Sequence, residues 1–122
     1  MNASGLPAVL AEAVGTLLFV FLGAGTVVVT GGLLGEGLTA ARLLAIAVAH
    51  GLAITLLVAA TARISGGHLN PAVTFAAFLN RSITLTQGIG YAVVQLIGAA
   101  VGAYLIQAVV PAGAAGTTAW MR

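Results

Sequence analysis

The chain has 122 residues, a formal net charge of +2, 61% hydrophobic residues and only 5% charged residues. A soluble domain carries roughly 25% charged residues to keep its surface in water, so this composition excludes one and predicts an integral membrane protein. Four scattered Arg residues form no basic patch for nucleic acid, and the absence of Cys excludes a disulfide framework and a thiolate metal site.

Three apolar stretches are long enough to cross a bilayer, which takes about 20 helical residues. They run from about 6–29, 42–61 and 87–110. The first contains one acidic residue, Glu12, and is too long for a signal peptide, besides lacking a basic start. The second has His50 as its only interior ionisable group, and the third ends before a proline. The sequence therefore predicts three transmembrane helices.

The segment 62–79, between the second and third stretches, is neither a span nor an ordinary loop. A short polar run with two glycines leads to Asn70-Pro71, and Asn and Pro are favoured at the N-cap and first position of a helix. A helix over 71–79 would be roughly 14 Å long, about half of a ~30 Å hydrocarbon core. Only Thr74 in it is polar, so an amphipathic surface helix would have no water-facing side. We expect a re-entrant half-helix.

The residues of this loop resemble those of a known family. The run Ser65-Gly66-Gly67-His68-Leu69-Asn70-Pro71-Ala72-Val73-Thr74 is similar to the signature loop of the aquaporin, or major intrinsic protein, family. The flanking spans agree with that family at Glu12, Thr16 and Phe19, and at Tyr91, Gln95, Gly98 and Gly102. Family members carry two such halves, inverted in the membrane, whereas residues 1–122 resemble one N-terminal-type half. The resemblance implies an all-α half-aquaporin fold, with three transmembrane helices and one re-entrant half-helix, completed by an inverted second protomer.

Physical chemistry explains why one half needs a second. Non-helical backbone in lipid leaves polar groups unpaired, at several kcal/mol each. An inverted homodimer requires the chain to insert in both orientations, and orientation follows the Lys/Arg bias of short loops. Under the family topology Arg63 and Arg81 lie on one side, and Arg42 and Arg122 on the other. This balance and the initiating Met favour an inverted homodimer over half of a heterodimeric channel or a piece of a longer protein.

Small residues in two spans offer surfaces for close helix approach. They are Gly98-x-x-x-Gly102 with its neighbouring alanines, and Ala47-x-x-x-Gly51 with Ala45 and Ala49. These surfaces could hold the dimer together or join four dimers into a tetramer-like ring, and the sequence does not separate the two uses.

The resemblance implies a pore with four groups of residues. The Asn-Pro-Ala motif is Asn70, Pro71 and Ala72; the carbonyl ladder is Gly66, Gly67, His68 and Leu69; the selectivity filter is His50, Val58, Gly67 and Val73; and Glu12 and Gln95 give structural support. Facing half-helix N-termini would repel protons and cations. Val73 stands where full-length members usually have Arg, and the filter set resembles that of plant vacuolar members, which implies passage of water and small neutral solutes.

Alternatives remain for individual residues. His50 could be a buried histidine bonded to a neighbouring carbonyl, although His50, Ile54 and Val58 share one helical face. Glu12 could form a salt bridge instead of accepting hydrogen bonds from the re-entrant loop. His68 is expected to brace the loop rather than to bind a metal, because no Cys or carboxylate lies near it in the sequence.

We therefore expect a passive channel for water and small neutral solutes the size of ammonia, urea or glycerol, which excludes ions and protons. Its partners are those solutes, the lipid bilayer and an inverted second copy, in the plasma membrane of a prokaryote. No catalytic residue, cofactor or metal is expected, since no nucleophile–base pair or ligand cluster is visible. The alternatives are half of a heterodimeric channel, a small coupled transporter and a non-conducting membrane scaffold.

Overall fold

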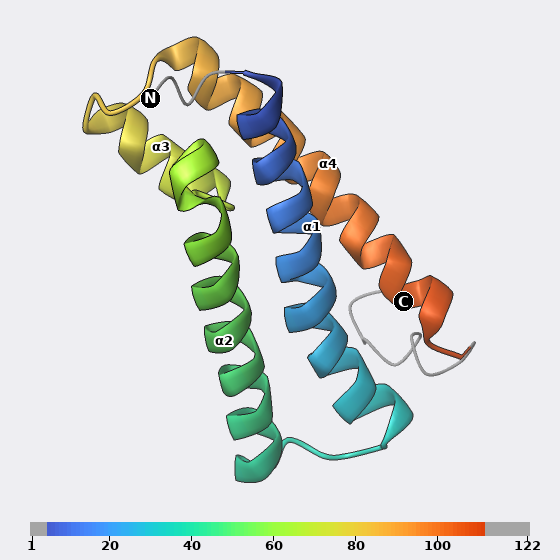
Figure 1. The fold of residues 1–122 in the computed structure, drawn as a ribbon. Coiled ribbons are helices and arrows are strands. Elements are labelled where there is room, and N and C mark those ends of the chain that lie inside the picture. Colours follow the sequence, from blue (N-terminus) through green and yellow to red (C-terminus); the bar gives the residue numbers. More distant parts are fainter. Residues whose placement is uncertain (1–4, 112–122) are drawn as a thin grey trace.

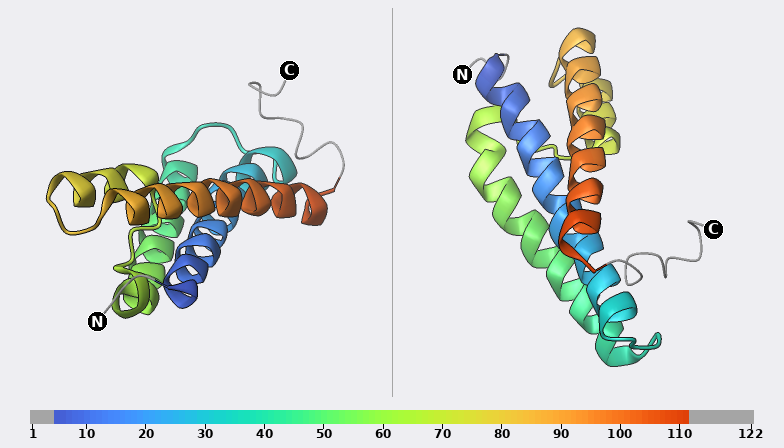
Figure 2. Two further views of the ribbon diagram at one scale, coloured as in Figure 1. Left: turned by 90° about the horizontal axis from the view of Figure 1, so that it is seen from above. Right: turned by 90° about the vertical axis from the view of Figure 1, so that its right-hand side faces the viewer.

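The computed structural model describes residues 5–111, which form an all-helical fold. The elements are α1 (Leu6–Val28), the π-helix η1 (Val29–Leu33) that continues it, α2 (Ala40–Ser65), α3 (Pro71–Leu79) and α4 (Leu85–Val109). The long helix α1 lies between α2 and α4, and the short α3 lies beside the first half of α4 (Figures 1 and 2). The stretches Leu6–Leu33, Ala40–Ser65 and Leu85–Val109 are long and apolar enough to cross a membrane. The predicted all-α membrane fold is confirmed.

Helix α2 is longer than the span predicted from the sequence, 42–61. Thr39 caps its start, because the Thr39 hydroxyl accepts from Arg42 N at 3.2 Å. At the other end the helix continues through Ser65 and stops at Gly66, whose φ of 98° is left-handed. Residues 62–65, which the sequence places in the loop, therefore form the last turn of α2. The non-helical link between α2 and α3 shrinks to residues 66–70.

The two glycines of Gly98-x-x-x-Gly102 are used inside the protomer. A Cβ atom on Gly98 would overlap the backbone oxygen of Ala13, and one on Gly102 would lie 2.5 Å from that of Leu17. Both glycines are buried, so α4 approaches α1 backbone to backbone at this crossing. They are therefore not the surface that joins protomers. Gly51 on α2 differs, because it is exposed and a Cβ there would meet no atom within 4 Å.

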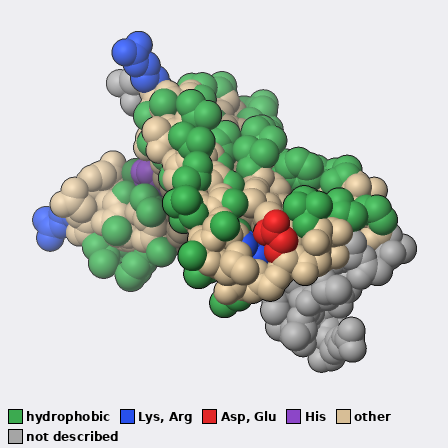
Figure 3. All heavy atoms as spheres, turned by 90° about the horizontal axis from the view of Figure 1, so that it is seen from below, with side chains coloured by type: hydrophobic (Ala, Val, Ile, Leu, Met, Phe, Trp, Pro, Cys, Tyr) green, Lys and Arg blue, Asp and Glu red, His purple; other side chains and the backbone are tan. Residues whose placement is uncertain are grey.

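The outer faces of the helices remain apolar. Helix α2 buries only Ala53, Thr61 and Ser65, and Leu56 in its middle is 67% exposed. Figure 3 shows one face, seen from below, on which hydrophobic side chains are widespread and charged ones few. Lipid or another protein chain must cover these faces, because so large an apolar area is unfavourable in water.

Candidate functional site

A single buried carboxylate connects the elements around the loop. Glu12, on α1, is 0% exposed. Its Oε1 accepts from Ser65 Oγ at 2.5 Å and from the backbone N–H of His68 at 2.9 Å. Its Oε2 accepts from the N–H of Leu69 at 2.6 Å and from Gln95 Nε2 at 2.8 Å. One side chain therefore ties α1 to the end of α2, to the loop and to α4.

A second layer of hydrogen bonds extends this cluster to the half-helix. Gln95 Nε2 also donates to the buried hydroxyl of Thr74 at 2.9 Å, and that hydroxyl lies 3.2 Å from His68 Nδ1. The hydroxyl of Tyr91 donates to Ser65 O at 3.0 Å, and its ring meets the His68 ring edge-on at a centroid distance of 5.5 Å. Gln95 Oε1 is buried and has no partner within residues 5–111.

Sequence reasoning gave no role to Ser65, Thr74 or Tyr91, which complete this network. Thr74 carried a usable signal, because it is the only polar side chain of an otherwise apolar half-helix. A buried polar side chain needs a hydrogen-bond partner, and in the structure Thr74 is buried and bonded to Gln95. Ser65 and Tyr91 gave no such signal, since the bond between them joins residues 26 positions apart.

The loop over 66–69 has its backbone donors bound and its backbone acceptors open. Gly66 N donates to Ala62 O at 3.1 Å and Gly67 N to Ser65 Oγ at 3.2 Å, while the next two N–H groups donate to Glu12. The four carbonyl oxygens of the loop accept no hydrogen bond from the part of the chain that the structure describes. The described peptides are all trans, so the C=O preceding a bound N–H is directed to the opposite side. Glu12 therefore turns the carbonyls of Gly67 and His68 away from itself.

Leu69 fixes the end of the loop against α1. Its φ of 52° is left-handed, which costs a non-glycine residue about 1–2 kcal/mol. Its side chain is 1% exposed and fills a notch at Gly15, where a Cβ atom would overlap it. Van der Waals contacts at this notch and the hydrogen bond from the Leu69 N–H to Glu12 hold the conformation.

Asn70 presents its amide at the start of the half-helix. Its Oδ1 accepts from Ala72 N at 2.8 Å and so caps α3, and Pro71 occupies the first turn. The residue is exposed, and Asn70 Nδ2 has no hydrogen-bond partner among residues 5–111. Three features thus lie next to one another in the chain: four open carbonyls, one open amide donor and the positive end of a helix.

Comparison with known proteins shows the family of the chain. Residues 2–121 match the family model described as major intrinsic protein. The chain belongs to the major intrinsic protein family. The resemblance read from the sequence, and the expectation of a membrane protein that is not an enzyme, are confirmed.

The chain is similar to one half of several plant aquaporins. It is 47% identical over 107 residues to the probable aquaporin TIP2-2 of Oryza sativa subsp. japonica, covering 87% of this chain and 43% of that protein. It is 47% identical over 108 residues to aquaporin TIP2-3 of Zea mays, with 88% and 44% covered. It is 46% identical over 103 residues to aquaporin TIP1-2 of Musa acuminata, with 84% and 41% covered. The chain spans less than half the length of these curated relatives.

Of the four filter positions that the family resemblance indicates, His50 packs on α1. Its Nδ1 lies 2.8 Å from Ile46 O, so Nδ1 carries the proton in this bond and the neutral ring keeps Nε2 as an acceptor. Its ring meets that of Phe19 edge-on at 5.9 Å, and a Cβ on Gly23 would lie 2.7 Å from Nε2. The alternative that His50 bonds to a neighbouring carbonyl therefore holds for Nδ1, and Nε2 is not used in that bond.

The other three filter positions lie apart from His50 in the described protomer. Val58 is half-buried on α2, Gly67 is buried in the loop, and Val73 is 48% exposed on α3. A Cβ on Gly67 would contact Thr61 and Ala62, not another filter residue. One protomer does not bring the four positions into a ring.

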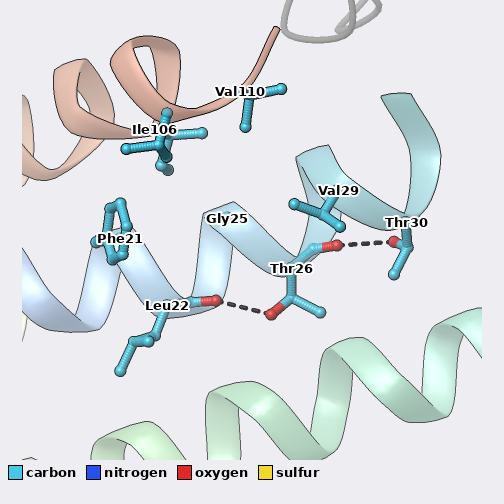
Figure 4. A pocket seen from close by; sticks show the side chains of 9 residues that line it. Phe21, Leu22, Gly25, Thr26, Val29, Thr30, Ile106 and Val110 are labelled. Carbon is cyan, nitrogen blue, oxygen red and sulfur yellow. Dashed lines mark hydrogen bonds between the residues drawn. The ribbon is translucent and has the colours of Figure 1, made fainter. Parts of the chain in front are cut away.

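An apolar groove lies away from all these residues, between α1 and the end of α4 (Figure 4). Its volume is about 300 Å³. It is lined by Phe21, Leu22, Gly25, Thr26, Val29, Thr30, Ile106, Val109 and Val110. The hydroxyls of Thr26 and Thr30 donate to carbonyls of their own helix at 2.8 Å, so they offer no donor to a solute. The groove fits an apolar neighbour rather than a polar substrate.

Proposed function

We propose that the chain forms a passive transmembrane channel for water by pairing with an inverted copy of itself. The observation that carries the proposal is the asymmetry of the loop, in which all four N–H groups are bound by the protein and all four carbonyls are open within the described residues. A row of open carbonyls can accept hydrogen bonds from successive water molecules. The open amide of Asn70 continues the row with a donor.

The same open groups support a second protomer. Carbonyls and an amide that faced hydrocarbon would cost several kcal/mol each, so such backbone survives only in protein or beside water. An inverted copy would set the two Asn70 residues and the two α3 N-termini against each other at the middle of the membrane. Each N-terminus carries roughly half a positive charge, which would exclude cations and protons.

The expected filter residues favour passage of several neutral solutes. In the inverted dimer, His50 of one protomer and Val58 of the other would meet Gly67 and Val73 at each mouth, with no Arg in the filter. We propose that water passes, together with ammonia and urea and solutes up to the size of glycerol. Four such dimers could form a ring, for which the exposed α2 face around Gly51 is available.

Coupled transport is a weaker candidate. A transporter needs a charged group that exchanges a proton or an ion during its cycle. Glu12 is the only carboxylate within the described spans, and its two oxygens already accept four hydrogen bonds at 0% exposure. It is committed to holding the loop.

Osmotic shrinkage of proteoliposomes, followed by stopped-flow light scattering, tests the channel. Wild type should shrink at least tenfold faster than empty liposomes. His50→Trp should return to near the empty rate by blocking the filter, whereas Leu44→Trp, at a 65% exposed position of α2, should keep the wild-type rate. A wild-type shrinkage rate equal to that of empty liposomes would refute the proposal. Parallel uptake of ammonia and urea defines the solute range.

Dual topology is tested separately. The chain has no Cys, so Glu36→Cys places one reactive thiol in the loop between η1 and α2. A membrane-impermeant maleimide should label that thiol from both sides of the membrane. Labelling from one side only would rule out an inverted homodimer and favour half of a heterodimeric channel. Arg122, which enters the predicted charge balance, lies outside the described residues.

The membrane that holds the channel is a further proposal. We propose the plasma membrane of a prokaryote. The relatives named above are plant proteins. Fractionation of the native cells, with the protein detected in each membrane, tests the location.

A further inference from the structure

Arg42, in the first turn of α2, is half-buried against the end of α1. Its Nε donates to Thr30 Oγ1 at 3.0 Å, its Nη2 to Val27 O at 3.1 Å and its Nη1 to Glu36 O at 3.2 Å. Gly31 makes room for the guanidinium, because a Cβ atom there would overlap Nη2. Three bonds from a planar, rigid group fix its position.

No carboxylate is among the three acceptors. Glu36 contributes its backbone oxygen to Arg42, and the other two acceptors are a hydroxyl and a helix carbonyl. A guanidinium remains charged at all ordinary pH values. The C-terminal end of α1 offsets its charge only in part, since a helix end carries roughly half a negative charge. The structure therefore holds a fixed, incompletely balanced positive charge at this end of α2.

Arg42 lies on the same face of α2 as the filter residue His50. The two residues are eight positions apart, which is two i to i+4 steps and roughly 12 Å along a helix. Both side chains contact α1, Arg42 at Val27 and His50 at Phe19. The charge therefore stands about two turns outside His50, toward the end of α2.

We propose that Arg42 is a selectivity residue, the positive charge that repels cations at each mouth of the channel. The inference rests on the proposed function, because the inverted dimer places one Arg42 outside each filter. The filter positions themselves carry no permanent charge, since they are His, Val, Gly and Val. A charge in the vestibule lowers the local concentration of K⁺ and of hydronium and leaves neutral water unaffected.

Three variants separate this electrostatic role from a structural one. Arg42→Gln removes the charge, Arg42→Lys keeps the charge but loses the planar fork, and Arg81→Gln removes an exposed charge that follows α3. In proteoliposomes at about 10 mM salt, Arg42→Gln should raise the K⁺ and proton leak about three- to tenfold. The lysine variant and Arg81→Gln should leak as wild type does. Equal leak in Arg42→Gln and wild type, or equal leak in Arg42→Gln and Arg42→Lys, would overturn the proposal.

Salt provides a test that needs no variant. The Debye length falls from about 30 Å at 0.01 M salt to about 3 Å at 1 M, so high salt screens the charge of Arg42. The K⁺ leak of the wild type, divided by the K⁺ concentration, should therefore rise severalfold with salt, while water permeability stays constant. A normalised leak independent of salt would refute the role of Arg42 even if Arg42→Gln failed to fold. Absence of water permeability in wild type would instead refute the channel, so the two failures are distinguishable.

Discussion

The sharpest prediction concerns Glu12→Gln, which keeps the shape of the side chain and removes its charge. The carboxylate accepts from two backbone N–H groups, of His68 and Leu69, and from two side chains, of Ser65 and Gln95. An amide has one oxygen and one NH₂ group, so in either orientation the NH₂ faces one backbone N–H and one side chain. The side chain can turn, because a hydroxyl rotates and an amide flips. The backbone N–H cannot, and it stays buried without a partner.

The cost follows from these contacts. One orphaned buried N–H costs about 1–3 kcal/mol, and the three remaining bonds lose an ionised acceptor, at about 1 kcal/mol each. We expect Glu12→Gln to destabilise the chain by roughly 4–6 kcal/mol, a large share of the ~5–15 kcal/mol that stabilises a typical protein. The carbonyls of the loop would lose their fixed direction, so water permeability should fall with stability.

Thermal unfolding in detergent measures the loss of stability. It is followed by the fluorescence of a dye that does not need to react with a thiol, because the chain has no Cys. The unfolding midpoint should drop by more than about 10 °C for Glu12→Gln. Glu36→Gln, which makes the same chemical change in the exposed loop before α2, should leave the midpoint unchanged. A drop below about 3 °C for Glu12→Gln, with water permeability retained, would refute the argument that its four bonds hold the loop.

Two pairs of glycine variants test the packing of the helices. Gly98→Ala should lower stability by about 1–3 kcal/mol, because its Cβ would overlap the backbone of α1. Gly90→Ala, on the same helix, has open space around its Cβ and should raise stability by up to about 1 kcal/mol. Equal effects of the two variants in unfolding scans would contradict the close approach of α4 to α1 at Gly98. Gly31→Ala should displace Arg42 and weaken the end of α1 by about 1 kcal/mol, while Gly37→Ala should change little. Unchanged stability and leak in Gly31→Ala would argue that the arginine is not held there.

The half-helix could be predicted closely because its signals are local. Asn70 and Pro71 mark the start of α3, and the structure begins it at Pro71 and ends it at Leu79, as expected from the pattern. Local rules apply since a cap and a first turn involve only neighbouring residues. The predicted end of α2, at about residue 61, was too early because the contact that extends the helix is not local. Ser65 looks like part of a loop until α1 supplies Glu12 as its acceptor, 53 positions away.

The use of the small residues could not be predicted from the sequence either. Gly98 and Gly51 look alike in a hydrophobic run, yet the first meets the backbone of α1 and the second meets nothing within 4 Å. The difference depends on which face of each helix turns inward, and the apolar pattern is nearly uniform around these helices. In lipid, uniform apolarity carries little information about facing, so helix contacts must be read from the structure.

The network explains how so few charges can build a membrane site. Glu12 binds donors from the loop, α2 and α4, and because each trans peptide directs its C=O opposite to its N–H, holding the donors on one side directs the acceptors to the other. Glu12, the one carboxylate within the described spans, is thus engaged in shaping the backbone and is not available to bind a solute. What the described residues present at the loop is dipoles, the open carbonyls and the amide of Asn70, which suit a neutral polar solute. The fixed charge of Arg42 lies about two helical turns beyond His50, outside the proposed filter, which is where a charge that repels cations would not bind water tightly.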